Sequence, residues 1–207
     1  MSPASPVFVI TGTSGAGKGT LVEELLRHVP EVAVAVSATT REQRPGEEDG
    51  REYWFLSHDE FASRLEEGEF LEHIDFPWGQ RSGTLWSELD RITAAGRAPL
   101  LELETHGALV VRDEVPGSVT IFVKAPTFDE LERRLRERAT ESAGEIGERL
   151  ELARQQLAQE DEFQHVVVND DLERATGELV AIVRRELDHA TMSGRDSSTH
   201  RQAARPG

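Results

Sequence analysis

The sequence contains no cysteine among its 207 residues, which excludes disulfide bridges, thiolate metal sites and cysteine nucleophiles. It also has no apolar run near the ~20 residues that span a bilayer. Residues 1–6 lack the basic region and apolar core of a signal peptide. These absences predict a cytoplasmic protein, and the length predicts one domain with small inserted lobes.

Positive charge is also scarce, because 23 basic side chains stand against 39 acidic ones and give a formal net charge of −16. A surface of that sign repels DNA, RNA and anionic membranes, so we expect no partner of these kinds. A small anionic ligand remains compatible with the charge, because a cleft can be locally positive. Lysine occurs only at Lys18 and Lys124, so a lysine in a glycine-rich segment stands out.

Short apolar, β-branched runs alternate with helical patterns along the chain, which is typical of buried strands and covering helices. This alternation predicts an α/β fold, a three-layer sandwich with a mostly parallel central sheet. We expect strands at 7–11, 32–36, 99–103, 119–123 and 165–168, and helices at 20–28, 85–95, 128–137, 146–159 and 172–188.

Residues 37–84 break this rhythm, because they are polar and rich in glycine, arginine, glutamate and aromatic side chains. They predict an inserted lobe rather than one crossover. From about Ser193 the chain is polar without apolar periodicity, which predicts disorder. The expected organisation is one domain at 4–188 (core 4–36 and 95–188, lobe 37–94) and a tail at 189–207.

A phosphate-binding pattern, G-x-x-x-x-G-K, lies between the first expected strand and helix. Its glycines let backbone N–H groups point at phosphate oxygens, and the helix N-terminus adds a positive dipole end. Lys18 would neutralise the β and γ phosphates of ATP; the alternative is a glycine-rich turn with a surface lysine. The candidate ATP-binding residues here are Gly12, Thr13, Ser14, Gly15, Ala16, Gly17, Lys18, Gly19 and Thr20.

The residue after Lys18 is Gly19, where phosphate loops usually carry serine or threonine. A hydroxyl follows at Thr20, and this G-K-G-T form resembles the loops of adenylate kinases. We therefore expect Mg²⁺ to be held mainly through water and phosphate oxygens, with Thr20 as a candidate ligand.

A second anion site is predicted in the segment after the second strand, SATTREQRPGE. Arg41 and Arg44 lie close together with Ser37, and guanidinium groups match phosphate oxygens bidentately. Tyr53 could add a hydroxyl donor. The alternative is a pair of solvated loop arginines.

Five segments together resemble the guanylate kinase family, the phosphate-loop enzymes that phosphorylate GMP with ATP. They are GTSGAGKGT, SATTREQRPGEEDGREYWF, EGEFLEH, RLRERATES and VVVNDD, in family order over about residues 7–188. The resemblance implies ATP-dependent phosphorylation of GMP and dGMP with Mg²⁺ as cofactor, in a monomer or homodimer. ATP and GMP would be its small-molecule substrates in purine nucleotide metabolism.

The resemblance also implies roles for individual residues on the acceptor side. Glu72 would accept hydrogen bonds from N1–H and the 2-amino group of guanine, and Thr84 would contact the base. The implied GMP-binding residues are Ser37, Arg41, Arg44, Tyr53, Glu72, Gly83, Thr84 and Glu104.

On the donor side, Arg134, Arg138 and Arg149 match the family's lid arginines, which close over the ATP phosphates; the lid would span about 134–150. Ordinary helical ion pairs are the alternative for these arginines. Asn169 matches a position that lies near the adenine in the family. The alternative role for Asn169 is to cap the N-terminus of the next helix. The candidate catalytic residues are Lys18, Arg41, Arg134, Arg138 and Arg149.

Two motifs depart from the family pattern on the acceptor side. The family's G-N-Y-Y-G-T is GQRSGT here, so Ser82 replaces a phosphate-binding tyrosine and Arg81 becomes a candidate anion contact. The segment from Glu72 to Gly79 is also one residue longer. The family's L-D-I-D is L-E-L-E, in which Glu102 would support Mg²⁺ and Glu104 would touch guanine.

Each aspartate-to-glutamate change adds about 1.5 Å of reach, and a displacement of that order can cost ~100-fold in rate. One alternative is therefore a kinase for another phosphorylated acceptor, such as ribose 1,5-bisphosphate or a modified purine nucleotide. The other is a non-catalytic interaction module, although such modules characteristically lose the phosphate loop.

Overall fold

The computed structural model describes residues 5–138 and 143–202 of the chain. Five parallel strands form a central sheet: β1 (Phe8–Gly12), β2 (Val32–Val34), β7 (Ala98–Glu102), β8 (Val119–Lys124) and β9 (His165–Val168). Their order is β2-β7-β1-β8-β9, so β1 lies in the middle and pairs with β7 and β8. The carboxyl ends of these strands therefore meet at one edge of the sheet.

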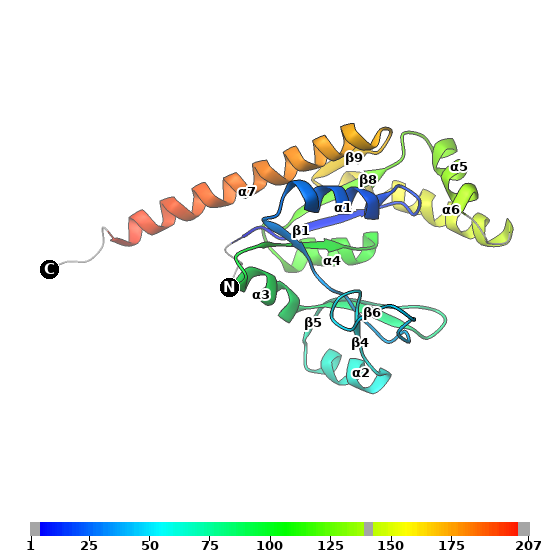
Figure 1. The fold of residues 1–207 in the computed structure, drawn as a ribbon, viewed down its shortest axis with the longest axis horizontal. Helices are drawn as coiled ribbons and strands as arrows, with labels where there is room; N and C mark the ends of the chain where they lie inside the picture. Colours follow the sequence, from blue (N-terminus) through cyan, green and yellow to red (C-terminus); the bar gives the residue numbers. More distant parts are fainter. Residues whose placement is uncertain (1–4, 139–142, 203–207) are drawn as a thin grey trace.

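Helices cover both faces of the sheet: α1 (Lys18–His28), α3 (Trp86–Ala94), α4 (Thr105–Glu114) and α7 (Leu172–Gln202). Phe8 and Ile10 of β1 pack with α1 and α7 in one apolar cluster. Val9 packs with α3 and α4 in a second cluster. Figure 1 shows these two helix layers on opposite sides of the sheet. This arrangement confirms the predicted three-layer α/β fold.

Two further helices, α5 (Phe128–Arg138) and α6 (Ala143–Leu157), project together from one end of the sheet (Figure 1). They pack through a separate apolar cluster that includes Leu131, Leu135, Ile146 and Leu150. A short 3-10 helix, η1 (Glu160–Glu162), leads back to β9. The predicted lid at about 134–150 covers the end of α5 and the first half of α6, and its residues 139–142 lie outside the described part of the chain.

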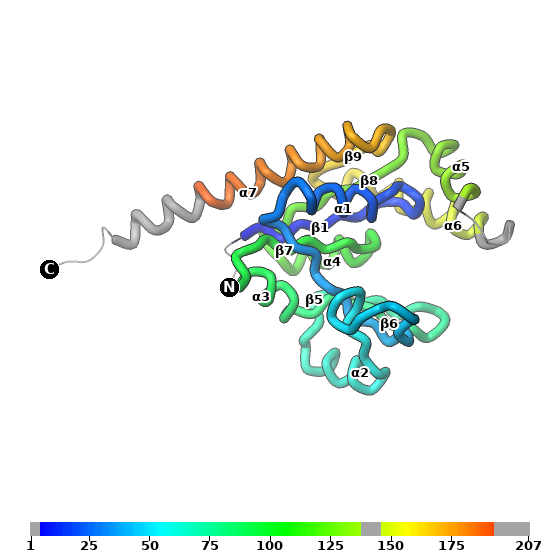
Figure 2. The backbone as a smooth tube through the Cα atoms, in the orientation of Figure 1, coloured from blue at the N-terminus to red at the C-terminus, as the bar shows by residue number. Residues whose placement is uncertain are grey.

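The segment between β2 and β7 forms a second sheet with strand order β4-β3-β6-β5. Its elements are β3 (Ala38–Thr39), β4 (Trp54–Phe55), α2 (His58–Glu66), β5 (Phe70–Asp75) and β6 (Arg81–Leu85). A small apolar cluster around Phe61 and Phe70 supports it. We call this sheet and α2 the lobe; Figure 2 traces its two connections to the core, one after β2 and one through α3.

The structure adds elements that periodicity did not indicate, namely α2, α4 and the four lobe strands. Ser57 and Glu60 form a capping box at the start of α2, and this pair is a sequence signal for the helix. At the other end of the chain, α7 continues to Gln202, so helix replaces the predicted disorder up to that residue. Residues 203–207 lie outside the described part. In the described residues, no helix is long and apolar enough to cross a membrane.

Candidate active site

The phosphate loop connects β1 to α1 at the carboxyl edge of the central sheet. Gly12 and Gly17 have φ values of 138° and 87°, a region that favours glycine. A Cβ at Gly12 would lie 1.9 Å from the Val123 carbonyl oxygen, and one at Gly17 would lie 2.6 Å from Nδ2 of Asn169. The curled loop therefore requires glycine at both positions.

The Lys18 side chain folds back over this loop. Its Nζ donates to the carbonyl oxygens of Gly12 at 2.8 Å and Thr13 at 3.2 Å. Burial lowers the pKa of Lys18, although the nearby carboxylates of Glu104 and Glu102 act in the opposite direction. A desolvated ammonium at the mouth of a loop of N–H donors is suited to an anionic ligand.

A cavity of about 410 Å³ lies between the core and the lobe, directly beside Lys18. We call it the acceptor cavity. Side chains from both parts of the molecule line it, so the two sheets build it together. The polar lining residues are Lys18, Ser37, Glu52, Tyr53, Glu72, His73, Ser82, Glu102, Glu104 and His106.

Glu72 lines this cavity and is paired with the buried Thr84, which the antiparallel pairing of β5 and β6 places opposite it. Oγ1 of Thr84 donates to Oε1 of Glu72 at 2.7 Å, and Glu72 is only 7% exposed. Burial raises the pKa of Glu72, partly offset by the Thr84 hydrogen bonds and nearby histidines. A Cβ at Gly107 would lie 2.9 Å from Oε2 of Glu72, so this glycine makes room for the carboxylate.

Glu102, the last residue of β7, and Glu104, two positions further on, line the same cavity. Burial raises the pKa of Glu102, and neighbouring Glu104 raises it further, although Lys18 lowers it. Oε2 of Glu104 accepts a hydrogen bond of 2.7 Å from Nε2 of Gln156. Sequence reasoning missed Gln156, because a glutamine in a polar helix carries no signal of burial.

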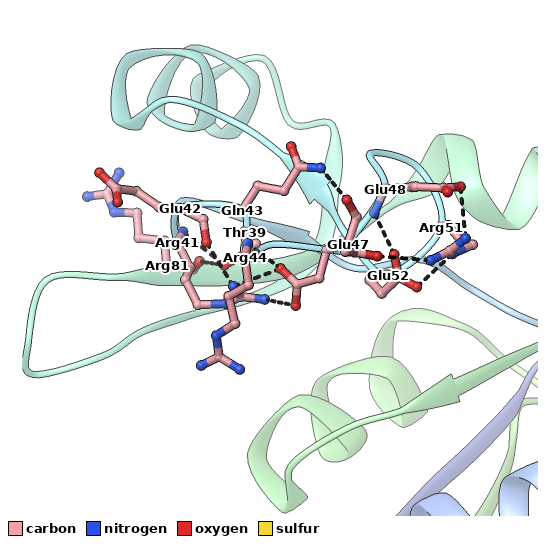
Figure 3. Close-up of polar contacts among 11 residues, drawn as sticks. Thr39, Arg41, Glu42, Gln43, Arg44, Glu47, Glu48, Arg51, Glu52 and Arg81 are labelled. Atoms are coloured by element: carbon pink, nitrogen blue, oxygen red, sulfur yellow. Dashed lines mark hydrogen bonds and ion pairs between the residues drawn. The ribbon is translucent and has the colours of Figure 1, made fainter.

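The predicted phosphate-binding arginines lie on the lobe loop beside the cavity rather than in its lining. Arg41 pairs bidentately with Glu47 at 2.9 and 3.0 Å, and its guanidinium lies 5.1 Å from the centre of the Tyr53 ring. The backbone N–H of Arg44 also donates to Glu47. Figure 3 shows the Arg44 guanidinium extended away from this carboxylate. Arg41 is thus an ordered, paired side chain and not a freely solvated one.

Arg81 lies at the start of β6 and is held by other groups of the lobe. Its Nε lies 3.1 Å from Oδ1 of Asp75, and its guanidinium lies over the Phe61 ring. Ser82 and Gly83 line the acceptor cavity, whereas Arg81 is not among its lining residues. The suggestion that Arg81 supplies an anion contact in place of the missing tyrosine stays a prediction.

A second cavity of about 340 Å³ is lined by other residues of the phosphate loop and by Arg134, and we call it the donor cavity. Arg134 lies in its wall, donating to Oε1 of Glu130 at 2.7 Å and to the Asn169 carbonyl oxygen at 3.0 Å. Arg134 therefore forms an ion pair within its own helix and also lines the cavity. The lining residues are Gly15, Gly17, Thr20, Arg134, Glu137, Asn169, Asp170 and Leu172.

Asn169 supports the phosphate loop, because its Nδ2 donates to the Ala16 carbonyl oxygen at 2.7 Å. The helix-cap alternative for Asn169 is wrong, since Asp171 accepts from the Arg174 N–H at the start of α7. Arg149 lies on α6, and the side chain of Arg138 lies outside the described part.

The two candidate metal ligands line different cavities. Thr20 lines the donor cavity and Glu102 the acceptor cavity. Among the described residues, no group of three or more histidine or acidic side chains could hold a metal ion. The donor set is therefore one carboxylate and one hydroxyl, which suits a hard cation that keeps water and phosphate ligands.

Comparison with known proteins gives one consistent result. The family model for guanylate kinase matches residues 4–186. The chain is 45% identical over 183 residues to guanylate kinase of Rubrobacter xylanophilus, covering 86% of this chain and 93% of that one. It is 49% identical over 175 residues to that of Frankia casuarinae, covering 84% and 95%. The crystal structure of guanylate kinase from Anaplasma phagocytophilum superposes with a TM-score of 0.69 at 26% identity, covering 90% and 88%.

Proposed function

The chain belongs to the guanylate kinase family and is an ATP-dependent GMP kinase, and we propose that the two cavities beside Lys18 are its acceptor and donor sites. The observation that supports this assignment is that Glu72, which is buried and paired with Thr84, lines the same cavity as Lys18. A carboxylate that could read a base and an ammonium that could bind phosphate would then serve one ligand.

In the acceptor cavity, Glu72 would accept from N1–H and the 2-amino group of guanine. Adenine has neither donor at these positions, so AMP would leave the second oxygen of this buried carboxylate without a donor. Thr84 restrains one carboxylate oxygen, while Gly83 and Glu104 line the space for the base.

The acceptor phosphate would lie at the lobe side of the cavity, near Ser37 and Tyr53. Arg41 and Arg44 would reach it from the adjoining loop. The Glu47 ion pair leaves part of the Arg41 guanidinium for a phosphate, because that group has five N–H donors.

Transfer would proceed in line, with an oxygen of the acceptor phosphate attacking the γ-phosphate of ATP and ADP leaving. Positioning and charge neutralisation supply the catalysis, and no covalent enzyme intermediate is required. Lys18 would hold the β and γ phosphates over the loop. Closure of the lid would add Arg134, Arg138 and Arg149 and exclude water.

We also propose magnesium as the cofactor, because the residues present fit it. Glu102 is a carboxylate whose ionised form is disfavoured by burial and by Glu104, so a cation beside it would relieve the repulsion. Glu102 and Thr20 line different cavities, so each would support the ion through water and phosphate oxygens rather than as a shared pair of direct ligands. When bound, magnesium neutralises charge on the β and γ phosphates.

The alternatives fit the site less well. A sugar bisphosphate would leave the Glu72–Thr84 pair without a base to contact, and an interaction module would not need the retained loop with Lys18. We propose a cytoplasmic location, which the absence of cysteine favours. A monomer or homodimer remains the expected assembly, and light scattering would distinguish the two.

A coupled ADP-release assay tests the acceptor directly, with GMP, dGMP, AMP, CMP, UMP and ribose 1,5-bisphosphate as substrates. We expect kcat/KM for GMP and dGMP to exceed that for the other acceptors by about 10³-fold or more, because the site hydrogen-bonds guanine specifically. Turnover with ribose 1,5-bisphosphate alone would establish the other acceptor class. Release of ADP with none of the six would contradict the assignment.

A further inference from the structure

One buried side chain joins the phosphate loop to the acceptor cavity. Gln156 lies on α6 and is 2% exposed. Its Oε1 accepts from the backbone N–H of Ser14 at 3.3 Å, and its Nε2 donates to Oε2 of Glu104 at 2.7 Å. Ser14 belongs to the loop and Glu104 to the cavity lining, so this amide spans the two sites.

The chemistry of the two contacts specifies an amide at this position. The Ser14 N–H requires an acceptor, and the Glu104 carboxylate requires a donor. A carboxylate at position 156 could not donate to Glu104, and an ammonium could not accept from Ser14. An apolar side chain would leave both partners without this contact in a buried place.

Glu104 has one more rotatable bond than an aspartate would have in the same place. Without a partner, its carboxylate would distribute over several rotamers. The short hydrogen bond from Gln156 restricts it to one position beside the cavity. This restraint compensates for the added length of the side chain.

The same face of α6 also carries Arg149. The two residues are seven positions apart, which is two helical turns, so their side chains lie one above the other. A rigid helix thus connects a lid arginine with the amide that holds Glu104. A shift of α6 would displace the Gln156 amide from both of its partners.

We infer that Gln156 is a positioning residue that fixes the Glu104 carboxylate for the acceptor, with the Ser14 backbone N–H orienting the Gln156 amide. The inference rests on the proposed contact between Glu104 and the acceptor base. Gln156 itself touches neither nucleotide and acts through Glu104.

The test measures KM for GMP and for ATP, together with kcat, in two variants of the full chain. Gln156→Met removes both hydrogen bonds at similar volume, and Gln156→Glu places a second carboxylate against Glu104. We expect each to raise KM for GMP about tenfold or more and KM for ATP less than about threefold, since a charged hydrogen bond is lost on the acceptor side. The matched control is Gln155→Glu, on the exposed side of the same helix, which should change neither value.

A double-mutant cycle identifies the route of the effect. Because Gln156 acts through Glu104, Gln156→Met should add no further rise in KM for GMP to a Glu104→Gln variant. Full additivity, or equal rises in both KM values in the folded single variants, would overturn the inference. A Glu104→Gln variant with unchanged KM for GMP would instead refute the proposed role of Glu104, and with it the premise.

Discussion

Three charged residues of the acceptor cavity sit where burial opposes their charge. Burial lowers the pKa of Lys18 and raises those of Glu72 and Glu102. These groups have lost part of their hydration on folding, so an oppositely charged or hydrogen-bonding ligand gains more from them than from a solvated group. The cavity therefore favours nucleotide binding, and its partly desolvated charged groups lower the stability of the ligand-free protein.

Lys18→Ala tests the phosphate loop. We expect kcat to fall by about 10²-fold or more, because the variant loses the cation at the transferred phosphate. The fold should remain, since Nζ of Lys18 bonds only to carbonyl oxygens of its own loop; circular dichroism and steady-state ADP release measure both. Lys124→Ala removes the other lysine, which pairs with Glu160 outside both cavities, and should retain activity. Near-normal turnover in Lys18→Ala would refute the assignment.

Glu72→Gln separates base recognition from stability. KM for GMP should rise about 10- to 100-fold, because a charged acceptor is lost. The raised pKa of Glu72 means that its ionised form is disfavoured in the folded state. Its contribution to the free energy of unfolding is therefore most favourable below the pKa of the unfolded chain. That contribution declines as pH rises through the pKa of the folded protein. The ligand-free variant should therefore melt higher than wild type at pH 7.5, with the difference shrinking toward pH 4. A lower melting temperature at pH 7.5 would contradict this account.

At the scale of elements, one carboxylate ties the lobe to the core at both of their connections. Glu88 on α3 is 2% exposed and accepts from the Val36 N–H at 2.9 Å and from Nε1 of Trp54 at 3.0 Å. Arg91 also donates to both of its oxygens at 2.9 and 2.8 Å. Val36 lies between β2 and β3, and α3 returns the chain to the core, so Glu88 orients the lobe over the acceptor cavity.

Glu88→Gln should destabilise the protein by about 1.5–3 kcal/mol, because an amide cannot accept from all these donors and Arg91 loses its charge partner. Burial raises the pKa of Glu88, but hydrogen bonds from Arg91, Val36 and Trp54 outweigh it and the net shift is downward. The wild-type advantage should thus be full above the unfolded pKa and decline as pH falls through the folded one. Urea unfolding at pH 7 and pH 3 measures both effects.

The matched control for this prediction is Asp90→Asn, which removes a carboxylate from the exposed side of the same helix. Its free energy of unfolding should stay within about 0.5 kcal/mol of wild type. A Glu88→Gln variant as stable as this control at pH 7 would show that the buried carboxylate does not hold the connections.

At the scale of the whole molecule, the net charge of −16 describes the outer surface and not the site. Acidic residues dominate the exposed helices, many in pairs with arginine such as Glu130 with Arg133. The acceptor and donor cavities share the phosphate-loop region, and each is lined by a basic side chain, Lys18 or Arg134. Function depends on this local reversal of sign, which segments distant in sequence create together.

The sequence by itself determined the features that depend on neighbouring residues. The phosphate loop is a run of glycines before Lys18, and the central strands are buried apolar runs, so composition and spacing within a few residues specify them. The motif segments with Glu72 and Asn169 also carried enough local information to indicate the family and its site.

Only the tertiary structure decided the contacts between distant segments. The lobe strands are as short as two residues, too short for a periodic pattern, and they exist because they pair with each other. The Glu88 contact with Val36 and the Gln156 contact with Glu104 each span 52 positions. A polar residue on a helix is usually solvated, so nothing local marks these two as buried; their partners, supplied by the fold, make burial favourable.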